Sequence, residues 1–192
     1  VHHPDYVVST SDGAHQFSKY GVVMEILRAG SMVEHRPRPM PTRWLNAAHD
    51  PAYVRAVLSA KVSPAIERRI GFAVTAEVAR RAVLSPGGTW LAAKLALRHG
   101  YAANAAGGSH HALYDGGAGY CVFNDLAVAA LRLLREGDAQ RILIVDLDVH
   151  QGDGTATILA ARGDVATLSV HAEKNFPVRK VISTLDVALP DG

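Results

Sequence analysis

Cysteine is almost absent from this chain, and long hydrophobic runs are missing altogether. Cys121 is the single cysteine among 192 residues, so no disulfide can form within the chain and a secreted disulfide scaffold is excluded. No apolar stretch approaches the ~20 residues that span a bilayer. The first residues, which include His2, His3 and Asp5, are too polar for a signal peptide. We therefore expect no membrane association and a reducing, cytoplasmic setting.

A strong excess of one charge is also missing. The formal net charge is +2, and adjacent basic residues occur only in short clusters such as Arg68-Arg69 and Arg80-Arg81. Without a continuous basic stripe, nucleic acid is not expected as a direct ligand. A content of 48% hydrophobic and 20% charged residues is typical of an ordinary globular chain, and we expect residues 1–192 to form a single domain. The chain starts at Val1 and stops at a turn signal, Pro190-Asp191-Gly192, which indicates a fragment of a longer protein.

The first hundred residues are expected to be mainly helical. Apolar spacing closed by Gly30 predicts a helix over 19–29, and the start signal Asp50-Pro51 predicts one over 52–60. Two more helices are predicted over 75–84 and 89–98. The last two are expected to be separated by Ser85-Pro86-Gly87-Gly88. Residues 31–51 contain four prolines, which favour a surface loop or a short edge strand over most of that stretch.

The second half reads as alternating strands and helices. The small residues 101–106 fit a short buried strand that leads directly to His110-His111. Asn124 is a good N-cap for a helix over 126–135. The run Ile142-Leu143-Ile144-Val145 predicts a strand over 141–147, buried on both faces of a parallel sheet, with a helix over 155–161 and a second strand over 165–170. This βαβ unit, whose crossover should be right-handed, indicates an α/β fold with a mostly parallel central sheet flanked by helices.

Two segments carry candidate acid/base chemistry. One is Gly108-Ser109-His110-His111, and the other runs from Asp146 to Gly154. Ligands of open α/β sheets bind beyond the carboxyl ends of the strands, where both segments are expected to lie. The imidazoles suit proton transfer at neutral pH, and Asp146 and Asp153 are the natural acceptors for their second ring nitrogens.

Asp148 and His150 are candidate metal ligands. If the strand continues past Asp146, the side chains of Asp146, Asp148 and His150 leave the same face, because the strand period is two. A carboxylate and an imidazole suit Zn²⁺ or another divalent ion, although a catalytic zinc site needs a third protein ligand. By itself the motif fits solvated carboxylates at a strand end with a capping histidine equally well. The nearby histidine pair favours hydrolysis by a metal-activated water over that alternative.

A glycine-rich loop connects the two segments. It runs from Gly116 to Asp125 and can form the wall of a narrow slot. By themselves, Tyr120 fits core packing better than substrate contact, and Cys121 fits a buried small hydrophobe better than a nucleophile.

The order and spacing of three motifs resemble the histone deacetylase superfamily, most closely its bacterial and class IV branch. They are Gly107-Gly108-Ser109-His110-His111-Ala112, Gly119-Tyr120-Cys121-Val122-Phe123-Asn124-Asp125 and Asp146-Leu147-Asp148-Val149-His150-Gln151-Gly152-Asp153-Gly154-Thr155. Shorter similarities run along most of the chain, among them His2-His3-Pro4-Asp5-Tyr6, His15-Gln16-Phe17, His49-Asp50-Pro51-Ala52-Tyr53 and Glu173-Lys174-Asn175-Phe176-Pro177.

The resemblance implies an arginase/deacetylase-type α/β fold and zinc-dependent hydrolysis of an acylated amine, either an acetyl-lysine or an acetylpolyamine. Zinc would be bound by Asp148 and His150. His111, oriented by Asp153, would be the general base and then acid, while His110 with Asp146 would stay charged or polarise the substrate. Gly119, Tyr120 and Phe176 would line the tunnel for the acyl-lysine stem. A potassium ion would be bound by the carbonyls of Asp146, Asp148, His150 and Val170 and by the Ser169 hydroxyl.

The sequence departs from the family pattern in one respect. The family takes its third zinc ligand, an Asp, and a transition-state Tyr from a region that follows the matched motifs, and neither is found here. Asp186 and Asp191 lack the surrounding pattern. We therefore expect the C-terminal part of the domain to be missing, leaving an unpaired sheet edge and exposed apolar surface. This fragment alone is expected to bind zinc weakly and to be nearly inactive.

Two other functions fit parts of the pattern. A non-catalytic module would keep the acyl-lysine slot without turnover. A ureohydrolase-like enzyme with two manganese ions would share the architecture, but it calls for more Asp ligands than the motif supplies. The sequence indicates neither the oligomeric state nor the acyl-chain length.

Overall fold

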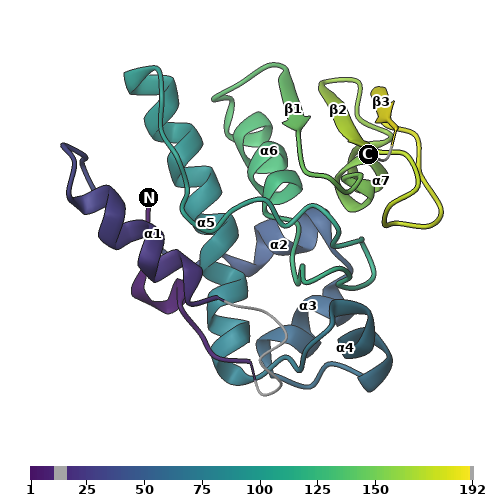
Figure 1. Ribbon diagram of the computed structural model, residues 1–192, viewed down its shortest axis with the longest axis horizontal. Helices are drawn as coiled ribbons and strands as arrows, with labels where there is room; N and C mark the ends of the chain where they lie inside the picture. Colours follow the sequence, from purple (N-terminus) through teal and green to yellow (C-terminus); the bar gives the residue numbers. More distant parts are fainter. Residues whose placement is uncertain (11–16, 191–192) are drawn as a thin grey trace.

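Helices of the first half of the chain pack against one another, and a three-stranded sheet follows them (Figure 1). The computed structural model describes residues 1–10 and 17–190; His15, Gln16 and Asp191 lie outside this range. The elements, in chain order, are η1 (Pro4–Tyr6), α1 (Lys19–Arg28), α2 (Thr42–Ala48), α3 (Pro51–Leu58), α4 (Pro64–Ile70), α5 (Ala76–His99), α6 (Asp125–Glu136), β1 (Ile142–Asp146), α7 (Asp153–Leu159), β2 (Val165–Ala172) and β3 (Leu185–Leu189).

The longest helix, α5, replaces the two helices expected over 75–84 and 89–98. It runs without interruption through Pro86, which cannot donate to the helix ladder. Carbonyls beside the proline accept hydrogen bonds from outside the helix instead: Met40 N donates to Val83 O at 2.8 Å, and Asn104 Nδ2 donates to Ser85 O at 3.2 Å. The prediction of a break was wrong because Pro86 removes a single donor from the ladder, and these contacts with Met40 and Asn104 hold the helix beside it.

Gly88 allows the close contact between α5 and η1. A Cβ at this position would lie 2.0 Å from Tyr6 Oη and 2.7 Å from Asn104 Oδ1. In an exposed helix, Gly→Ala stabilises by roughly 1 kcal/mol. Here we expect the opposite sign, a loss of about 2 kcal/mol in unfolding free energy, because the added methyl overpacks a buried site.

Urea denaturation of Gly88→Ala checks this expectation. The double variant with Tyr6→Phe, which removes the nearest clashing atom, should lose less relative to Tyr6→Phe alone. A Gly88→Ala variant as stable as the wild type would show that the contact is not tight.

Several short elements were not expected from the sequence. α2 lies within the proline-rich stretch 31–51, where three prolines precede the helix, Pro51 follows it, and its interior is free of proline. α4 begins at Ser63-Pro64, an N-cap followed by a first-turn proline. β3 was also missed. Conversely, residues 101–106 form no strand. Their hydrogen bonds go to the N-terminal segment and, through Asn104, to α5 rather than to another strand.

The sheet is parallel throughout, with the order β1-β2-β3. Ile144 of β1 and Val165 of β2 join the main core, together with Val128 of α6 and Leu159 of α7, so these helices cover one face. The expected βαβ unit of β1, α7 and β2 is present, and the α/β class with a parallel sheet flanked by helices is confirmed.

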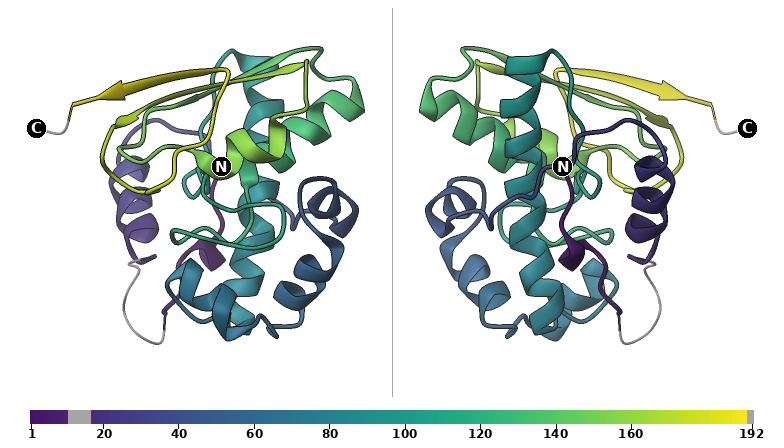
Figure 2. Two further views of the ribbon diagram at one scale, coloured as in Figure 1. Left: turned by 90° about the vertical axis from the view of Figure 1, so that its right-hand side faces the viewer. Right: turned by 90° about the vertical axis from the view of Figure 1, so that its left-hand side faces the viewer.

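The other face of the sheet is apolar and exposed. Pairing aligns Val145 with Leu168 and Leu168 with Leu185, and Leu143 and Val187 lie on the same face. Leu143 is 62% exposed, so the expectation that the first strand is buried on both faces is wrong within the described residues. Figure 2 shows β3 along an outer edge of the sheet. An unpaired edge and exposed apolar surface were expected.

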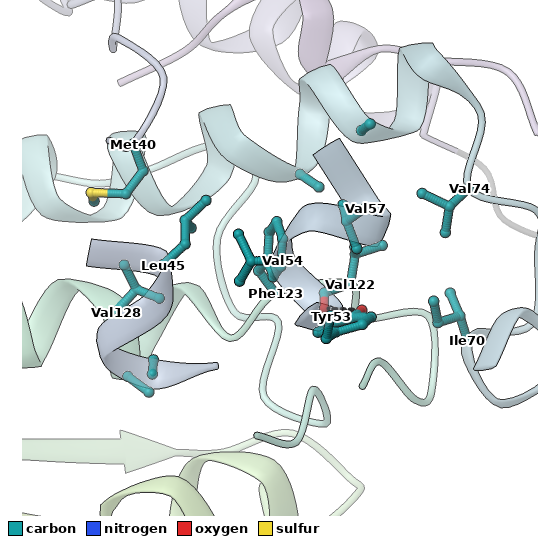
Figure 3. Packing of buried hydrophobic residues seen from close by; sticks show 14 of the residues in the cluster. Met40, Leu45, Tyr53, Val54, Val57, Ile70, Val74, Val122, Phe123 and Val128 are labelled. Atoms are coloured by element: carbon teal, nitrogen blue, oxygen red, sulfur yellow. Dashed lines mark hydrogen bonds between the residues drawn. The ribbon is translucent and has the colours of Figure 1, made fainter. Parts of the chain in front are cut away.

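The main core lies between α2, α3, α5 and α6 (Figure 3). Tyr53 is buried there and donates its hydroxyl to Val122 O at 2.7 Å, which fixes the end of the glycine-rich loop. Asn124 then caps α6 by accepting from Ala127 N at 2.9 Å, as predicted. The core therefore sets the position of the segment that carries the candidate site.

Candidate functional site

The strand β1 ends at Asp146, so Asp148 and His150 lie in the following bends rather than on the strand. The expectation that alternation along a strand places Asp146, Asp148 and His150 on one face is therefore wrong. Local hydrogen bonds shape the turn instead: Asp146 Oδ1 accepts from Asp148 N at 3.0 Å, and Asp148 Oδ1 accepts from His150 N at 2.8 Å. The side chains still converge, because each carboxylate caps the backbone two residues ahead.

The histidine pair lies in a loop that is hydrogen-bonded to the starts of α6 and α7, and not at the end of a strand as expected. The buried side chain of Asn124 donates to His110 O at 3.3 Å and to Thr155 Oγ1 at 3.0 Å, and Thr155 N donates to the same His110 carbonyl at 3.0 Å. Asp125, also buried, accepts from Ser109 N at 2.6 Å. These contacts fix the backbone of the pair.

Asn124 and Asp125 are therefore positioning residues that the sequence did not single out as such. Asp125 also accepts from Gly108 N at 3.1 Å and from the Thr89 hydroxyl. In the sequence, an Asn followed by an acidic residue signals a helix start. The second role of Asn124 and Asp125, which is to fix the histidine loop, depends on a segment more than ten positions earlier in the chain. No local sequence pattern indicates that role.

His110 is paired with Asp146. Its Nδ1 lies 2.6 Å from Asp146 Oδ2, and its Nε2 lies 3.9 Å from Asp148 Oδ1. Burial alone would lower the pKa of His110, but the hydrogen bond and charge of Asp146, with the charges of Asp148 and Asp153, outweigh it and raise the pKa. This arrangement favours the protonated imidazolium.

His111 is paired with Asp153, the first residue of α7. Its Nδ1 lies 2.7 Å from Asp153 Oδ1, and both side chains are buried. A carboxylate at Nδ1 requires the ring proton there, so the lone pair of the neutral ring lies on Nε2. The two imidazole rings are 3.9 Å apart, centroid to centroid. The pair thus consists of two histidines, each with its own carboxylate, as the sequence indicated.

Asp148 and His150 face the histidine pair. Their side chains are 50% and 38% exposed, and His150 Nδ1 lies 2.9 Å from Asp148 Oδ1. Partial burial acts to raise the pKa of Asp148, but the hydrogen bond from His150 N and the charge of His110 lower it overall. The rings of His111 and His150 are 5.7 Å apart. The structure therefore brings the segment of His110 and His111 together with the segment that follows Asp146.

The donor set fits a zinc ion in part. A carboxylate oxygen and an imidazole nitrogen are zinc donors, and the two groups lie close enough to share one ion. A catalytic site takes three protein ligands, yet no group of at least three metal-binding side chains occurs within residues 1–10 and 17–190. Asp186 is engaged elsewhere, since its carboxylate accepts from Gln151 Nε2 at 2.9 Å and from Ser183 N at 2.8 Å.

A cavity of about 650 Å³ opens over these groups and is also lined by Gly119, Tyr120 and Phe176. The Phe176 ring stands edge-on to His111, with centroids 4.8 Å apart. Gly119 has φ of 51°, and a Cβ there would lie 2.5 Å from the His111 ring, so only glycine fits this wall. Tyr120 is 48% exposed, which corrects its assignment to the core. Cys121 is buried, and burial raises the pKa of its thiol to about 12, in line with the expected inert role.

Of the residues suggested for potassium, Asp146, Ser169 and Val170 lie on adjacent strands, whereas Asp148 and His150 lie in the bends after β1. Asp146 and Ser169 are partners in the β1–β2 register, and Val170 follows on β2. Ser169 Oγ lies 3.0 Å from His171 Nδ1 and accepts from Gly152 N at 3.5 Å. Potassium at this position stays a proposal.

Fold and site together define an α/β protein with two histidine–carboxylate pairs and, beyond the end of a parallel strand, an adjacent carboxylate and imidazole. The sequence profile of the histone deacetylase domain matches residues 14–187, and the chain belongs to that family. The resemblance inferred from the motifs is thereby confirmed. Along the described residues, no helix is both long and apolar enough to cross a membrane.

Similar proteins support this assignment. The chain is 44% identical over 198 residues to an uncharacterised protein of Picosynechococcus sp., covering 100% of this chain and 66% of that protein. It is 41% identical over 91 residues to a probable deacetylase of Methanothermobacter thermautotrophicus, covering 47% of this chain and 28% of that one. For histone deacetylase 2 of Arabidopsis thaliana the identity is 38% over 91 residues, covering 47% of this chain and 24% of that protein.

The crystal structure of the HDA15 HD domain shares the fold, with a TM-score of 0.71 at 22% identity, covering 86% of this chain and 50% of that one. The chain therefore spans 66% or less of each of these proteins. Relatives named as deacetylases support a hydrolase as the kind of protein.

Proposed function

We propose that this chain is the larger part of a single zinc-dependent deacetylase domain that hydrolyses the amide of an acylated amine. The observation that supports this most strongly is the pair of buried imidazoles, each bonded to its own carboxylate and both facing Asp148 and His150 across the cavity. Two adjacent histidines, each hydrogen-bonded to its own carboxylate, can divide the work of amide hydrolysis. One takes and returns a proton, and the other stabilises negative charge.

His111 is the general base and then the general acid. With Nδ1–H directed to Asp153, Nε2 accepts a proton from the attacking water and then delivers it to the departing amine. His110, kept charged by Asp146, stabilises the negative charge that develops on the carbonyl oxygen. Asp153 and Asp146 act through the imidazoles, by fixing their orientation and protonation.

The cavity walls position the substrate. Gly119, Tyr120 and Phe176 form an apolar passage that suits the methylene stem of an acylated lysine. Zinc, bound by Asp148, His150 and a further ligand outside the described residues, would supply Lewis acidity toward the amide carbonyl and the water. Potassium beside Ser169 would have a structural role.

A deacylation assay on the product of the complete coding sequence tests the proposal. We expect release of acetate from an acetyl-lysine peptide, loss of that activity after treatment with a chelator, and recovery on addition of zinc. Turnover that is insensitive to the chelator would contradict zinc dependence. Restoration by manganese alone, at two ions per chain, would favour the ureohydrolase-like alternative.

A further inference from the structure

The lining of the cavity carries more positive than negative charge. Its cationic side chains are Lys19, Arg68, Arg69 and Arg81, whereas Asp148 is the only carboxylate among the described residues that line it. Arg81 is buried, with its guanidinium 4.1 Å from the centroid of the Phe17 ring. Asp146 and Asp153 lie behind the lining, where they are paired with the imidazoles. The exposed charges of the lining are therefore mainly positive, with Lys19, Arg68 and Arg69 against Asp148.

Arg68 and Arg69 are fixed beside the substrate wall. They lie in the last turn of α4, and the end of this helix is tied to the glycine-rich loop by two backbone hydrogen bonds. Gly119 N donates to Arg69 O at 3.0 Å, and Tyr120 N donates to Ile70 O at 2.7 Å. The turn that bears the arginines is thus attached to the wall that would contact the acyl-lysine stem.

These arginines are not neutralised by acids of the described chain. Arg69 Nη2 lies 3.9 Å from Asp115 Oδ1, and both side chains are exposed, so the pair is weak. Arg68 is exposed and takes part in no ion pair found within residues 1–10 and 17–190. Lys19 adds an exposed ammonium from a second element, the start of α1. The exposed positive groups come from two elements, so they can contact residues of a bound segment as well as the modified side chain itself.

We propose that this site selects acyl-lysine within an acidic stretch of a protein, an inference that rests on the proposed function. The acyl-lysine side chain is neutral. The exposed cations Lys19, Arg68 and Arg69 of the cavity lining, which we call the positive rim, therefore act on the residues that flank it. Flanking Asp or Glu would be attracted by Lys19 and Arg68. The free ammonium groups of an acylpolyamine, or the neighbouring lysines of a basic tail, would be repelled.

Binding of matched peptides to the product of the complete coding sequence, carrying His111→Asn to suppress turnover, tests this selection. Labelled peptides of equal length carry one central acetyl-lysine with flanks of Glu, Ser or Lys, and N-acetylspermidine serves as an unlabelled competitor. Fluorescence anisotropy at low salt should give the acidic peptide about tenfold tighter binding than the neutral one, as expected for a few exposed charge pairs, and the preference should shrink at 0.5 M salt as screening increases. An acidic peptide with Ala in place of acetyl-lysine should bind more weakly than its acetylated counterpart.

Arg68→Glu and Arg98→Glu form a matched pair of variants. Both residues are exposed arginines in the last turn of a helix, α4 and α5 respectively, and α5 ends far from α4 (Figure 1). Arg68→Glu should remove most of the acidic preference, whereas Arg98→Glu should retain it. Circular dichroism confirms that each variant is folded.

Other outcomes overturn the proposal in distinguishable ways. Equal binding of the three flanked peptides, a preference for basic flanks, strong competition by N-acetylspermidine, or equal effects of the two variants would contradict the charge selection while leaving the proposed function intact. Failure of every acetylated peptide to bind better than the Ala peptide would contradict the acyl-lysine slot itself, and the proposed function with it.

Discussion

Replacement of His111 by Ala is expected to lower kcat/KM for deacylation by about 10²- to 10⁴-fold, the range typical of general acid/base catalysis. The imidazole is the group whose Nε2 is free to exchange a proton while Nδ1 is directed to Asp153. Among the described residues that line the cavity, His110 is the nearest comparable group, and its hydrogen bond to Asp146 raises its pKa, which makes it a poorer base. The assay uses the product of the complete coding sequence, with an acetyl-lysine peptide at concentrations below KM.

Two controls separate chemistry from folding. His111→Ala leaves the buried carboxylate of Asp153 unpaired, which can destabilise the protein. His111→Asn retains an N–H for Asp153 but has no basic nitrogen, so its activity should fall by a similar factor with less effect on stability. His99→Ala, which replaces an exposed histidine at the end of α5, should have wild-type activity. Near-full turnover of both His111 variants would refute the assignment.

The free energy of unfolding is expected to fall by about 3 kcal/mol between pH 6.5 and pH 4 on account of His49 alone. Burial lowers the pKa of His49 to about 4 from the ordinary value of 6.5, although a hydrogen bond to Leu113 O opposes the shift. Its Nδ1 lies 2.8 Å from Leu113 O, and its Nε2 accepts from Asn124 N at 3.0 Å. These contacts require the neutral ring with its proton on Nδ1.

The direction of the pH effect follows from proton binding. Between pH 4 and 6.5 the unfolded chain binds a proton at His49 and the folded chain does not. Stability is therefore complete above the unfolded pKa and is lost as the pH falls toward the folded pKa.

Urea unfolding of the wild type and of His49→Gln at several pH values isolates this contribution. The variant lacks the titrating group, so the difference in unfolding free energy between the two proteins should shrink by about 3 kcal/mol as the pH falls from 6.5 to 4. His99→Gln should show the same pH profile as the wild type. Parallel profiles for the wild type and His49→Gln would mean that His49 is protonated in the folded protein.

Elements with a complete local pattern were predicted well. The helix that starts after Asn124 contains a cap, a periodic apolar stripe and a final Gly137, and it forms α6 nearly as expected. The apolar run before Asp146 forms β1 for the same reason. In both cases the information lies within one segment.

Predictions failed where distant segments supply the missing interactions. The sequence around Pro86 and Gly88 looks like a break, yet Met40, Asn104 and Tyr6 make the uninterrupted α5 possible. The burial of β1 was misjudged because an apolar run does not reveal how many layers cover a sheet. Asp148 and His150 were expected on a strand, whereas side-chain bonds to the backbone form a turn there.

The sequence by itself determined the chemical groups of the site and the family, because residue types at fixed spacing define which donors and acceptors are available. The resemblance also implied which histidine pairs with which carboxylate, but only the tertiary structure brings the partners into contact. His110 and Asp146 are 36 positions apart, and His111 and Asp153 are 42 apart, so the pairing depends on how α6 and α7 hold the loop against the end of β1. The positive rim was likewise settled by packing, since Arg68 reaches the cavity only because the end of α4 is bonded to Gly119 and Tyr120.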